Sequence, residues 1–304
     1  MKTMDQKTPK KLWGFFALLF AMVCGSLMSP LFKTALSLGA APLGVAFWRM
    51  VMTVGVIFLL CRVKSGLWQD VKTIVRERKL FFEVLGMGLM RGFEVICWSL
   101  SLSMSGTFVV NILGNITPIF TIILVYLLYR ERTAMGAILS VGLSLVGVVL
   151  IGLNGSATGG APLLAFIIMP LSSFAYGVYL LLGREVTKRV AAPALMLFVF
   201  AVTMVMVLIF GTVSGMSMAL PTSALPYVGL IALCCTLLSQ TITSWCMKSL
   251  KPTTISVMNL FSPVLSATAA WLLIGEAVAP SILLGGGVVL LGLFLYLMAA
   301  ERSK

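Results

Sequence analysis

The sequence predicts an all-α integral membrane protein with ten transmembrane helices, arranged as two inverted five-helix repeats. Three observations predict this fold. Hydrophobic residues make up 60% of the 304 residues and charged residues only 10%, whereas a soluble domain has about 25% charged residues. Ten apolar stretches are long enough to cross a bilayer, which takes about 20 residues each. Basic residues also cluster in every second connection between these stretches, as the positive-inside rule requires.

The ten predicted helices are separated from one another by Gly, Pro or clusters of charge. We expect them at roughly 12–36, 43–62, 80–103, 105–128, 134–153, 162–183, 193–213, 226–249, 253–274 and 278–300. The boundary between the third and the fourth is the least marked, because only Ser103 to Gly106 separate them. The amino-terminal segment is basic, and nine further apolar stretches follow the first. We therefore expect the first helix to be retained and not removed as a signal peptide.

The distribution of charge predicts the orientation. Nineteen of the 22 Lys and Arg residues lie in the two tails and in the links after the second, fourth, sixth and eighth helices. The other five links contain none. We therefore expect a multi-pass protein of the inner (plasma) membrane with both termini in the cytoplasm. Topology accounts for the net charge of +13, so nucleic acid is not an expected partner.

An internal repeat relates the two halves of the chain, 1–154 and 155–304. The stretch NITPIFTIILVYLLYRERTAMGAILSVGLSLVG matches LFSPVLSATAAWLLIGEAVAPSILLGGGVVLLG at an offset of 145. The aligned pairs are Pro118 with Pro263, Glu131 with Glu276, Gly142 with Gly287, and Gly147 with Gly292. Such a register over some 30 residues indicates a true repeat. Each half has an odd number of helices, so the second enters the membrane from the opposite side. Inverted repeats are typical of secondary transporters with a site near the bilayer midplane.

Several loose motifs recur in a specific order along the chain. They are the Pro-containing fourth and ninth helices, the RER and GEA turns after them, the Gly-rich fifth and tenth helices, and AFWRM at the start of the second helix. In these features essentially the whole chain resembles the EamA family of the drug/metabolite transporter superfamily. The resemblance implies a central cavity lined mainly by helices 1, 3, 4, 6, 8 and 9. It also implies transport, often outward, of amino acids, amines, nucleosides or related metabolites.

Four charged residues fall inside the predicted spans: Lys33, Arg49, Arg91 and Glu94. A charge at the centre of a membrane helix costs about 2.5–3.5 kcal/mol, so each needs a reason. Arg91 and Glu94 lie near the middle of the third helix, and their i, i+3 spacing puts them on one face, which Trp98 continues. They form either a structural ion pair or part of a cavity lining. In the second case Arg91 binds a carboxylate or phosphate, and Glu94 binds an ammonium group or a coupling proton.

The remaining special residues of the first, second, fourth and ninth helices have candidate structural or gating roles. Lys33 and Arg49 lie toward the outer side, where they either extend to the interface or take part in gating, and the resemblance favours a structural or gating role for Arg49. Pro30 follows a run of small residues and is a candidate gate hinge. Pro118 and Pro263 free backbone carbonyls in matching regions of two helices.

Polar and aromatic side chains on the other helices complete the candidate substrate site. They are Asn111 and Asn115 on the fourth helix, Tyr176 and Tyr179 on the sixth, Gln240, Ser244 and Trp245 on the eighth, and Asn259 on the ninth. Amides and hydroxyls next to exposed carbonyls bind polar ligands in a cavity, and aromatic faces suit flat or cationic ligands. The alternative for the polar residues is helix packing without further function.

Other function classes lack the residues they need. The sequence contains no GxxxxGK[ST] motif, so we do not expect it to use ATP directly. It contains no His, and its six cysteines lie in or at the ends of apolar stretches without metal-site spacing. We therefore expect no enzyme, no metal and no cofactor.

The sequence as a whole predicts a secondary transporter that works by alternating access. We expect an exporter of small polar metabolites, with amino acids or amino-acid-like zwitterions and anions first, because the spans hold three cations and one anion. The alternative cargo is an amine or cationic drug held by Glu94 and the aromatic residues. A more distant alternative is a non-transporting scaffold or sensor. The expected partners are the small-molecule substrate, the lipid bilayer and a coupling proton or ion.

Overall fold

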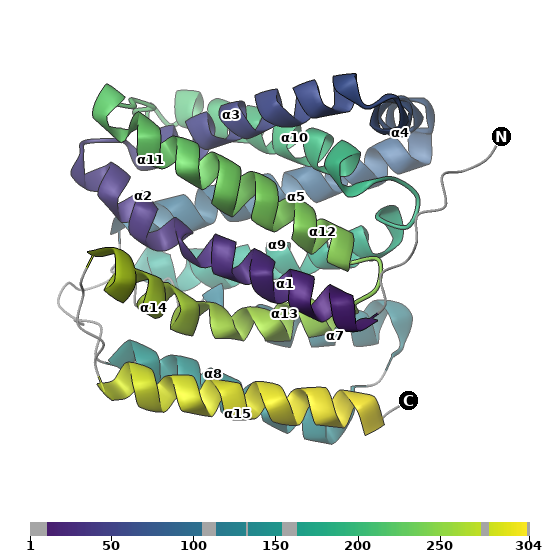
Figure 1. Cartoon of the computed structure of the whole chain (residues 1–304), viewed down its shortest axis with the longest axis vertical. Coiled ribbons are helices and arrows are strands. Elements are labelled where there is room, and N and C mark those ends of the chain that lie inside the picture. Colours follow the sequence, from purple (N-terminus) through teal and green to yellow (C-terminus); the bar gives the residue numbers. More distant parts are fainter. Residues whose placement is uncertain (1–10, 105–113, 132, 154–162, 275–279, 303–304) are drawn as a thin grey trace.

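The computed structural model describes residues 11–104, 114–131, 133–153, 163–274 and 280–302. Every regular element in these ranges is a helix, and they contain no strand. The helices form one bundle (Figure 1). The predicted all-α fold is therefore confirmed.

The first half contains the elements up to residue 153. They are α1 (Lys11–Ser26), α2 (Met28–Ser37), α3 (Pro42–Val63), α4 (Ser65–Arg76), α5 (Arg78–Met104), α7 (Thr117–Tyr129) and α8 (Met135–Leu153). α1 and α2 together form the first predicted span. α4 is a short amphipathic helix between the second and third predicted spans, where no helix was predicted. Most of the segment between α5 and α7, 105–113, lies outside the described residues.

The second half contains the elements from residue 163 onward. They are α9 (Leu163–Val186), α10 (Ala192–Val213), a 3₁₀ turn (Thr222–Ala224), α11 (Leu225–Leu230), a π-helix (Ile231–Leu238), α12 (Ser239–Cys246), α13 (Pro252–Met258), a second 3₁₀ turn (Asn259–Phe261), α14 (Ser262–Ile274) and α15 (Pro280–Arg302). α11, the π-helix and α12 follow one another without a gap, as do α13, the second 3₁₀ turn and α14.

The outer surface of the bundle is apolar, as a lipid environment requires. Five helices are long and apolar enough to cross a membrane within the described ranges, and three further apolar helices are shorter. Large side chains such as Trp13, Leu59, Leu139 and Leu272 are 64–69% exposed. A soluble protein does not expose apolar surface on this scale. The bundle is thus an integral membrane domain.

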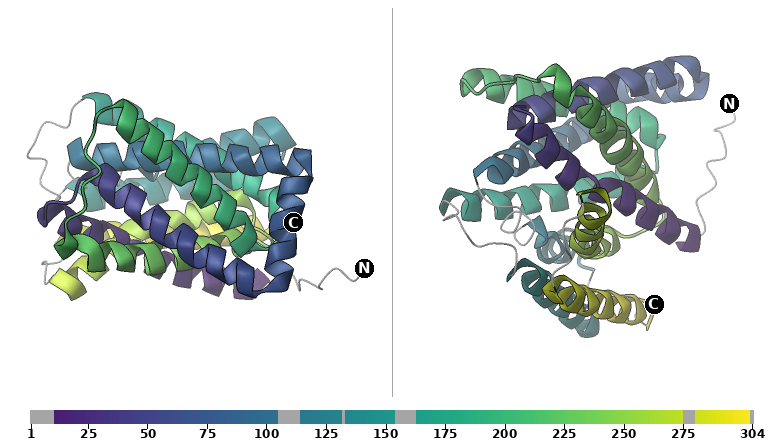
Figure 2. Two further views of the ribbon diagram at one scale, coloured as in Figure 1. Left: turned by 90° about the horizontal axis from the view of Figure 1, so that it is seen from above. Right: turned by 60° about the vertical axis from the view of Figure 1, so that its left-hand side comes forward.

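Two helices from opposite halves, α8 and α15, pack along each other at one edge of the bundle (Figures 1 and 2). Glycine allows their backbones to approach closely. A Cβ atom on Gly147 would lie 2.7 Å from the carbonyl oxygen of Gly285. The small-residue contact holds the halves together by close packing, which is the main source of helix association in lipid.

One end of the bundle is rich in Lys and Arg and is called the basic end below. It holds α4, the start of α1 and the end of α15 (Figure 1). At this end Glu131 accepts a hydrogen bond from Arg184 Nη2 at 2.8 Å and lies 3.5 Å from Lys251 Nζ. The hydrogen bond from Arg184 lowers the pKa of Glu131 below its ordinary value. These contacts join the end of α9 to two connections, one from each half of the chain.

Candidate functional site

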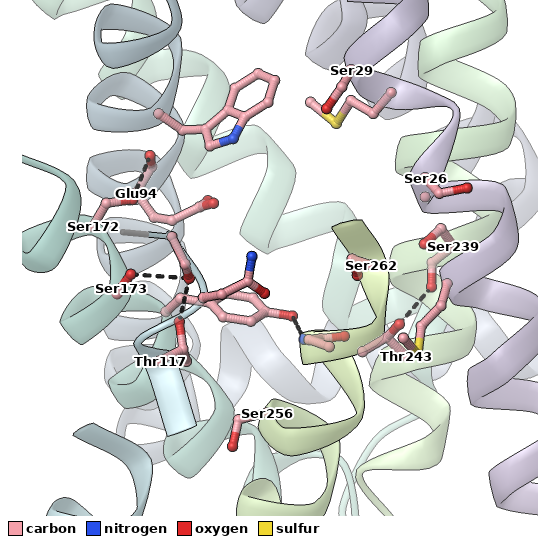
Figure 3. Close-up of a pocket in the computed structure, with 18 of the residues that line it drawn as sticks. Ser26, Ser29, Glu94, Thr117, Ser172, Ser173, Ser239, Thr243, Ser256 and Ser262 are labelled. Carbon is pink, nitrogen blue, oxygen red and sulfur yellow. Dashed lines mark hydrogen bonds between the residues drawn. The ribbon is translucent and has the colours of Figure 1, made fainter. Parts of the chain in front are cut away.

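A polar cavity of about 240 Å³ lies between the helices. Its lining comes from α1, α2, α5, α7, α9, α12, α13 and α14, and from Arg49 of α3. In Figure 3, Glu94, Ser172 and Ser173 lie on one side, while Ser26, Ser29 and Ser239 lie on the other. These are the helices that the family resemblance implied, with α3 in addition.

Hydroxyl groups dominate the polar lining of the cavity. They belong to Ser26, Ser29, Thr117, Ser172, Ser173, Ser239, Thr243, Ser256, Ser262 and Ser266. Several of them donate their hydrogen to a backbone carbonyl, for example Ser239 to Ala21 at 2.7 Å. Such a hydroxyl oxygen still has lone pairs that accept hydrogen bonds from a ligand.

Arg91 and Glu94 form an ion pair on the cavity-facing side of α5. Arg91 Nη1 donates to Glu94 Oε2 at 2.8 Å, and the side chains are only 8% and 17% exposed. The guanidinium also lies over the rings of Tyr176 and Tyr179, at 5.4 and 5.7 Å from the ring centroids. The two tyrosines stack on each other with their centroids 5.7 Å apart. Arg91 is therefore held by one carboxylate and two aromatic faces.

Arg49 is the second cation that lines the cavity. The residue is only 2% exposed and is buried among the helices. Among the described residues its guanidinium makes one hydrogen bond, from Nη1 to the thioether sulfur of Met28 at 3.3 Å, while Nε has no partner. One turn further on, Thr53 Oγ1 donates to Ala232 of the π-helix at 3.1 Å and fixes α3 against the π-helix.

Prolines interrupt helices beside the cavity, and hydroxyl groups from other helices satisfy two of the carbonyls that they free. Pro30 cannot donate to Ser26, whose carbonyl instead accepts from Ser266 of α14 at 3.2 Å. Pro118 cannot donate to Gly114, whose carbonyl accepts from Ser173 of α9 at 3.1 Å. Such replacement allows a bent helix inside a membrane.

The repeat places matching breaks in the two halves. α7 begins at Thr117, and α14 begins at Ser262, which is 145 residues later. A proline follows each of these residues, and all four line the cavity. The breaks therefore lie at equivalent points of the repeat.

Most of the residues predicted to bind substrate meet at the cavity. They are Arg91, Glu94, Trp98, Asn115, Tyr176, Gln240 and Asn259, and the predicted structural or gating residues Arg49, Pro118 and Pro263 line it as well. Asn259 Nδ2 donates to Tyr176 Oη at 3.4 Å, which joins the second 3₁₀ turn to α9.

The other predicted site residues do not line this cavity. Tyr179 is buried behind Tyr176 and contacts the sulfur of Met196. Ser244 is buried, and Trp245 packs against the main hydrophobic core. Pro30 lies in α2 beyond the break, and Lys33 is exposed further along the same helix. Asn111 falls outside the described residues.

Sequence reasoning missed part of the lining. Met22, Met28 and Met169 carry no sequence signal that separates them from ordinary apolar residues of a span. On α12 the sequence predicts a binding face that contains Gln240 and Ser244, but the cavity is lined by Ser239, Gln240 and Thr243. A hydroxyl i, i+4 pair at Ser239 and Thr243 was the signal available for that face.

Comparison with known proteins identifies the family and the fold. The model of the EamA-like transporter family matches residues 12–153 and again residues 163–298. A solved structure described only as "Crystal structure of protein" aligns with a TM-score of 0.77 and 15% sequence identity, over 97% of this chain and 100% of that one. At this identity the likeness shows a shared fold. No protein with a curated description matches the chain.

Proposed function

The chain belongs to the EamA-like transporter family, and on that basis we propose that it exports small polar metabolites that carry an acidic group, with amino acids and amino-acid-like zwitterions first. It moves them by alternating access of the cavity to the two sides of the membrane. The two inverted halves exchange conformations, so that an inward-open state becomes an outward-open one.

The charge of the cavity is the observation that carries this proposal. Its described lining contains two cations, Arg49 and Arg91, and one anion, Glu94, which leaves one positive charge. An uncompensated charge in a membrane interior is costly, and an acidic group on the cargo offsets it. A carboxylate also matches the planar fork of a guanidinium.

The remaining lining favours a compact hydrophilic cargo over a large drug. The cavity volume of about 240 Å³ lies below the 300–1,000 Å³ of pockets for drug-sized ligands. Its hydroxyl oxygens are acceptors suited to an ammonium group or a hydroxyl on the cargo. Glu94 is a further acceptor for an ammonium group on the cargo. Arg91 donates to its Oε2 and, among the described residues, not to its second carboxylate oxygen.

A cationic amine is the second candidate cargo. It is favoured by the combination of Glu94 with the ring of Tyr176 and the indole of Trp98, all of which line the cavity. A carboxylate and aromatic faces together are the usual means of holding an organic cation.

Orientation, membrane and coupling complete the proposal. We place the protein in the inner (plasma) membrane with the basic end, and so both termini, in the cytoplasm, because the positive-inside rule favours that side. Transport is facilitated, exchanged or driven by a proton or ion gradient.

Counterflow in proteoliposomes tests the proposed function. Vesicles containing the purified protein are loaded with one unlabelled compound, and entry of the same labelled compound is followed. We expect exchange of one or more protein amino acids and none of tetraphenylphosphonium, spermidine or ethidium. Exchange of the amines without any amino acid would replace the first candidate with the second, and exchange of neither would contradict both.

A further inference from the structure

Arg49 is a buried cation without a counter-charge in the part of the chain that the structure describes. It is 98% buried, and no carboxylate lies within ion-pair distance of it there. Its one hydrogen-bond acceptor is the sulfur of Met28. A thioether is a weak, uncharged acceptor, so this contact does not offset the desolvation of a guanidinium.

The other cation of the cavity is already neutralised. Glu94 is the one carboxylate of the described lining, and its Oε2 lies 2.8 Å from Arg91 Nη1. The stacked rings of Tyr176 and Tyr179 hold the same guanidinium from the side. A cargo that bound to Arg91 would therefore compete with an existing ion pair, whereas one that bound to Arg49 would not.

The position of Arg49 is fixed by packing. Its neighbour Met50 is fully buried, and Thr53, one turn away, bonds both to the carbonyl of Arg49 and to that of Ala232. The side chain lines the cavity with its Nε unpartnered. The packing of α3 thus sets the point from which the Arg49 side chain extends, and the planar fork of its guanidinium matches a planar, bidentate acceptor.

We infer that Arg49 is the subsite for the acidic group of the cargo, and that a carboxylate binds there through a charge-assisted bidentate contact. Arg91 and Glu94 form the opposite side of the site, where the second oxygen of Glu94 receives an ammonium group. This assignment rests on the proposed function and departs from the sequence-based expectation that Arg91 takes the anionic group.

The assignment makes a prediction about the protein without cargo. Arg49→Met removes a charge that no described group offsets, so the apparent melting temperature of the ligand-free protein should stay equal or rise. Arg91→Met strands the carboxylate of Glu94 and should lower the melting temperature. If Arg49 has a purely structural role, both substitutions should lower the melting temperature.

Ligand-induced thermal stabilisation then tests the subsite itself. The purified protein is heated with each protein amino acid, with inorganic phosphate, and with acetate. The amide and the decarboxylated amine of the most stabilising amino acid serve as charge-altered probes. We expect the amino acid to raise the melting temperature, the amide and the amine to fail, and Arg49→Met to bind about ten- to hundredfold more weakly.

A matched control separates the subsite from a general effect of positive charge. Arg62 lies on the same helix α3, outside the cavity and exposed, so Arg62→Met should bind as the wild type does. Arg49→Lys keeps the charge but loses the fork and should recover only part of the affinity. Stabilisation by phosphate alone, lost in Arg49→Met, would retain the anion subsite and assign it to a phosphorylated cargo.

Two results would overturn the inference if an amino acid stabilises the wild type. One is an amino-acid shift in Arg49→Met as large as in the wild type, which would leave the proposed transport function standing. The other is a ligand-free Arg49→Met protein that is destabilised as strongly as Arg91→Met. If no amino acid stabilises the wild type, amino acids are not the cargo, and the anion probes test the subsite instead. Stabilisation by neither phosphate nor acetate would then remove the subsite as well.

Discussion

At the scale of single residues, the Arg91–Glu94 ion pair neutralises two charges that are buried inside the bundle. Breaking a buried ion pair from one side leaves an uncompensated charge, which costs about 3 kcal/mol or more. We therefore expect Arg91→Met and Glu94→Met each to lower the thermal stability of the purified protein. The double variant should recover most of the loss, because neither charge remains. A double variant less stable than both single variants would show that the two side chains do not act as a pair.

The same residues show what the sequence can and cannot predict. Spacing alone predicted that Arg91 and Glu94 share a face, and the ion pair has that geometry. The sequence did not decide between an interfacial Arg49 and a buried one. The choice depends on how α3 is rotated against the π-helix and on Met28 of a different helix, and no local pattern encodes either.

At the scale of elements, hydroxyl groups that replace lost helix hydrogen bonds should measurably stabilise the bends. Ser266→Ala leaves the carbonyl of Ser26 without its donor, and an unsatisfied buried carbonyl costs about 1–3 kcal/mol. Thr268→Ala on the same helix is the control, because that side chain is exposed and donates to Val264 of its own helix. We expect Ser266→Ala to lower the melting temperature and Thr268→Ala to leave it unchanged. Equal effects would contradict a role for Ser266 in the break between α1 and α2.

Element boundaries were predictable where proline or charge marks them. Pro118 and Pro263 were predicted to free backbone carbonyls in matching regions of two continuous spans, and α7 and α14 in fact begin one residue before them. The π-helix Ile231–Leu238 was not predictable from apolar periodicity, since it adds residues to a turn without changing composition. Within α12 the predicted binding face included Ser244, whereas the cavity is lined by Ser239, Gln240 and Thr243.

At the scale of the whole molecule, the α8–α15 contact joins the two halves through glycine. Gly147→Ala would place a methyl group 2.7 Å from the backbone of α15, and overpacking of this kind costs about 1–3 kcal/mol. Gly142 on the same helix has open space around it, so Gly142→Ala should be neutral or slightly stabilising. Thermal unfolding of the two variants is the measurement. A Gly147→Ala protein as stable as Gly142→Ala would mean that the backbones are not in close contact.

The ion cluster at the basic end predicts a pH dependence of stability. Arg184 and Lys251 lower the pKa of Glu131. The stabilisation that Glu131 provides is therefore complete above the ordinary glutamate pKa of about 4.3 and is lost as the pH falls through the lowered value. Melting temperatures of the wild type and Glu131→Gln should differ at neutral pH and converge in acid. A difference that stays constant down to acid pH would exclude an ionised Glu131 as its source.

The central claim is that cargo crosses the membrane through the cavity between the two halves. The most direct measurement is amino-acid counterflow in proteoliposomes that contain the wild type, Ser29→Phe or Ser37→Phe. Ser29 lines the cavity, whereas Ser37 is exposed at the end of the same helix. A phenyl ring at Ser29 occupies much of the cavity, so we predict that exchange is lost in Ser29→Phe and retained in Ser37→Phe. Exchange at the wild-type rate in a folded Ser29→Phe protein would contradict the claim.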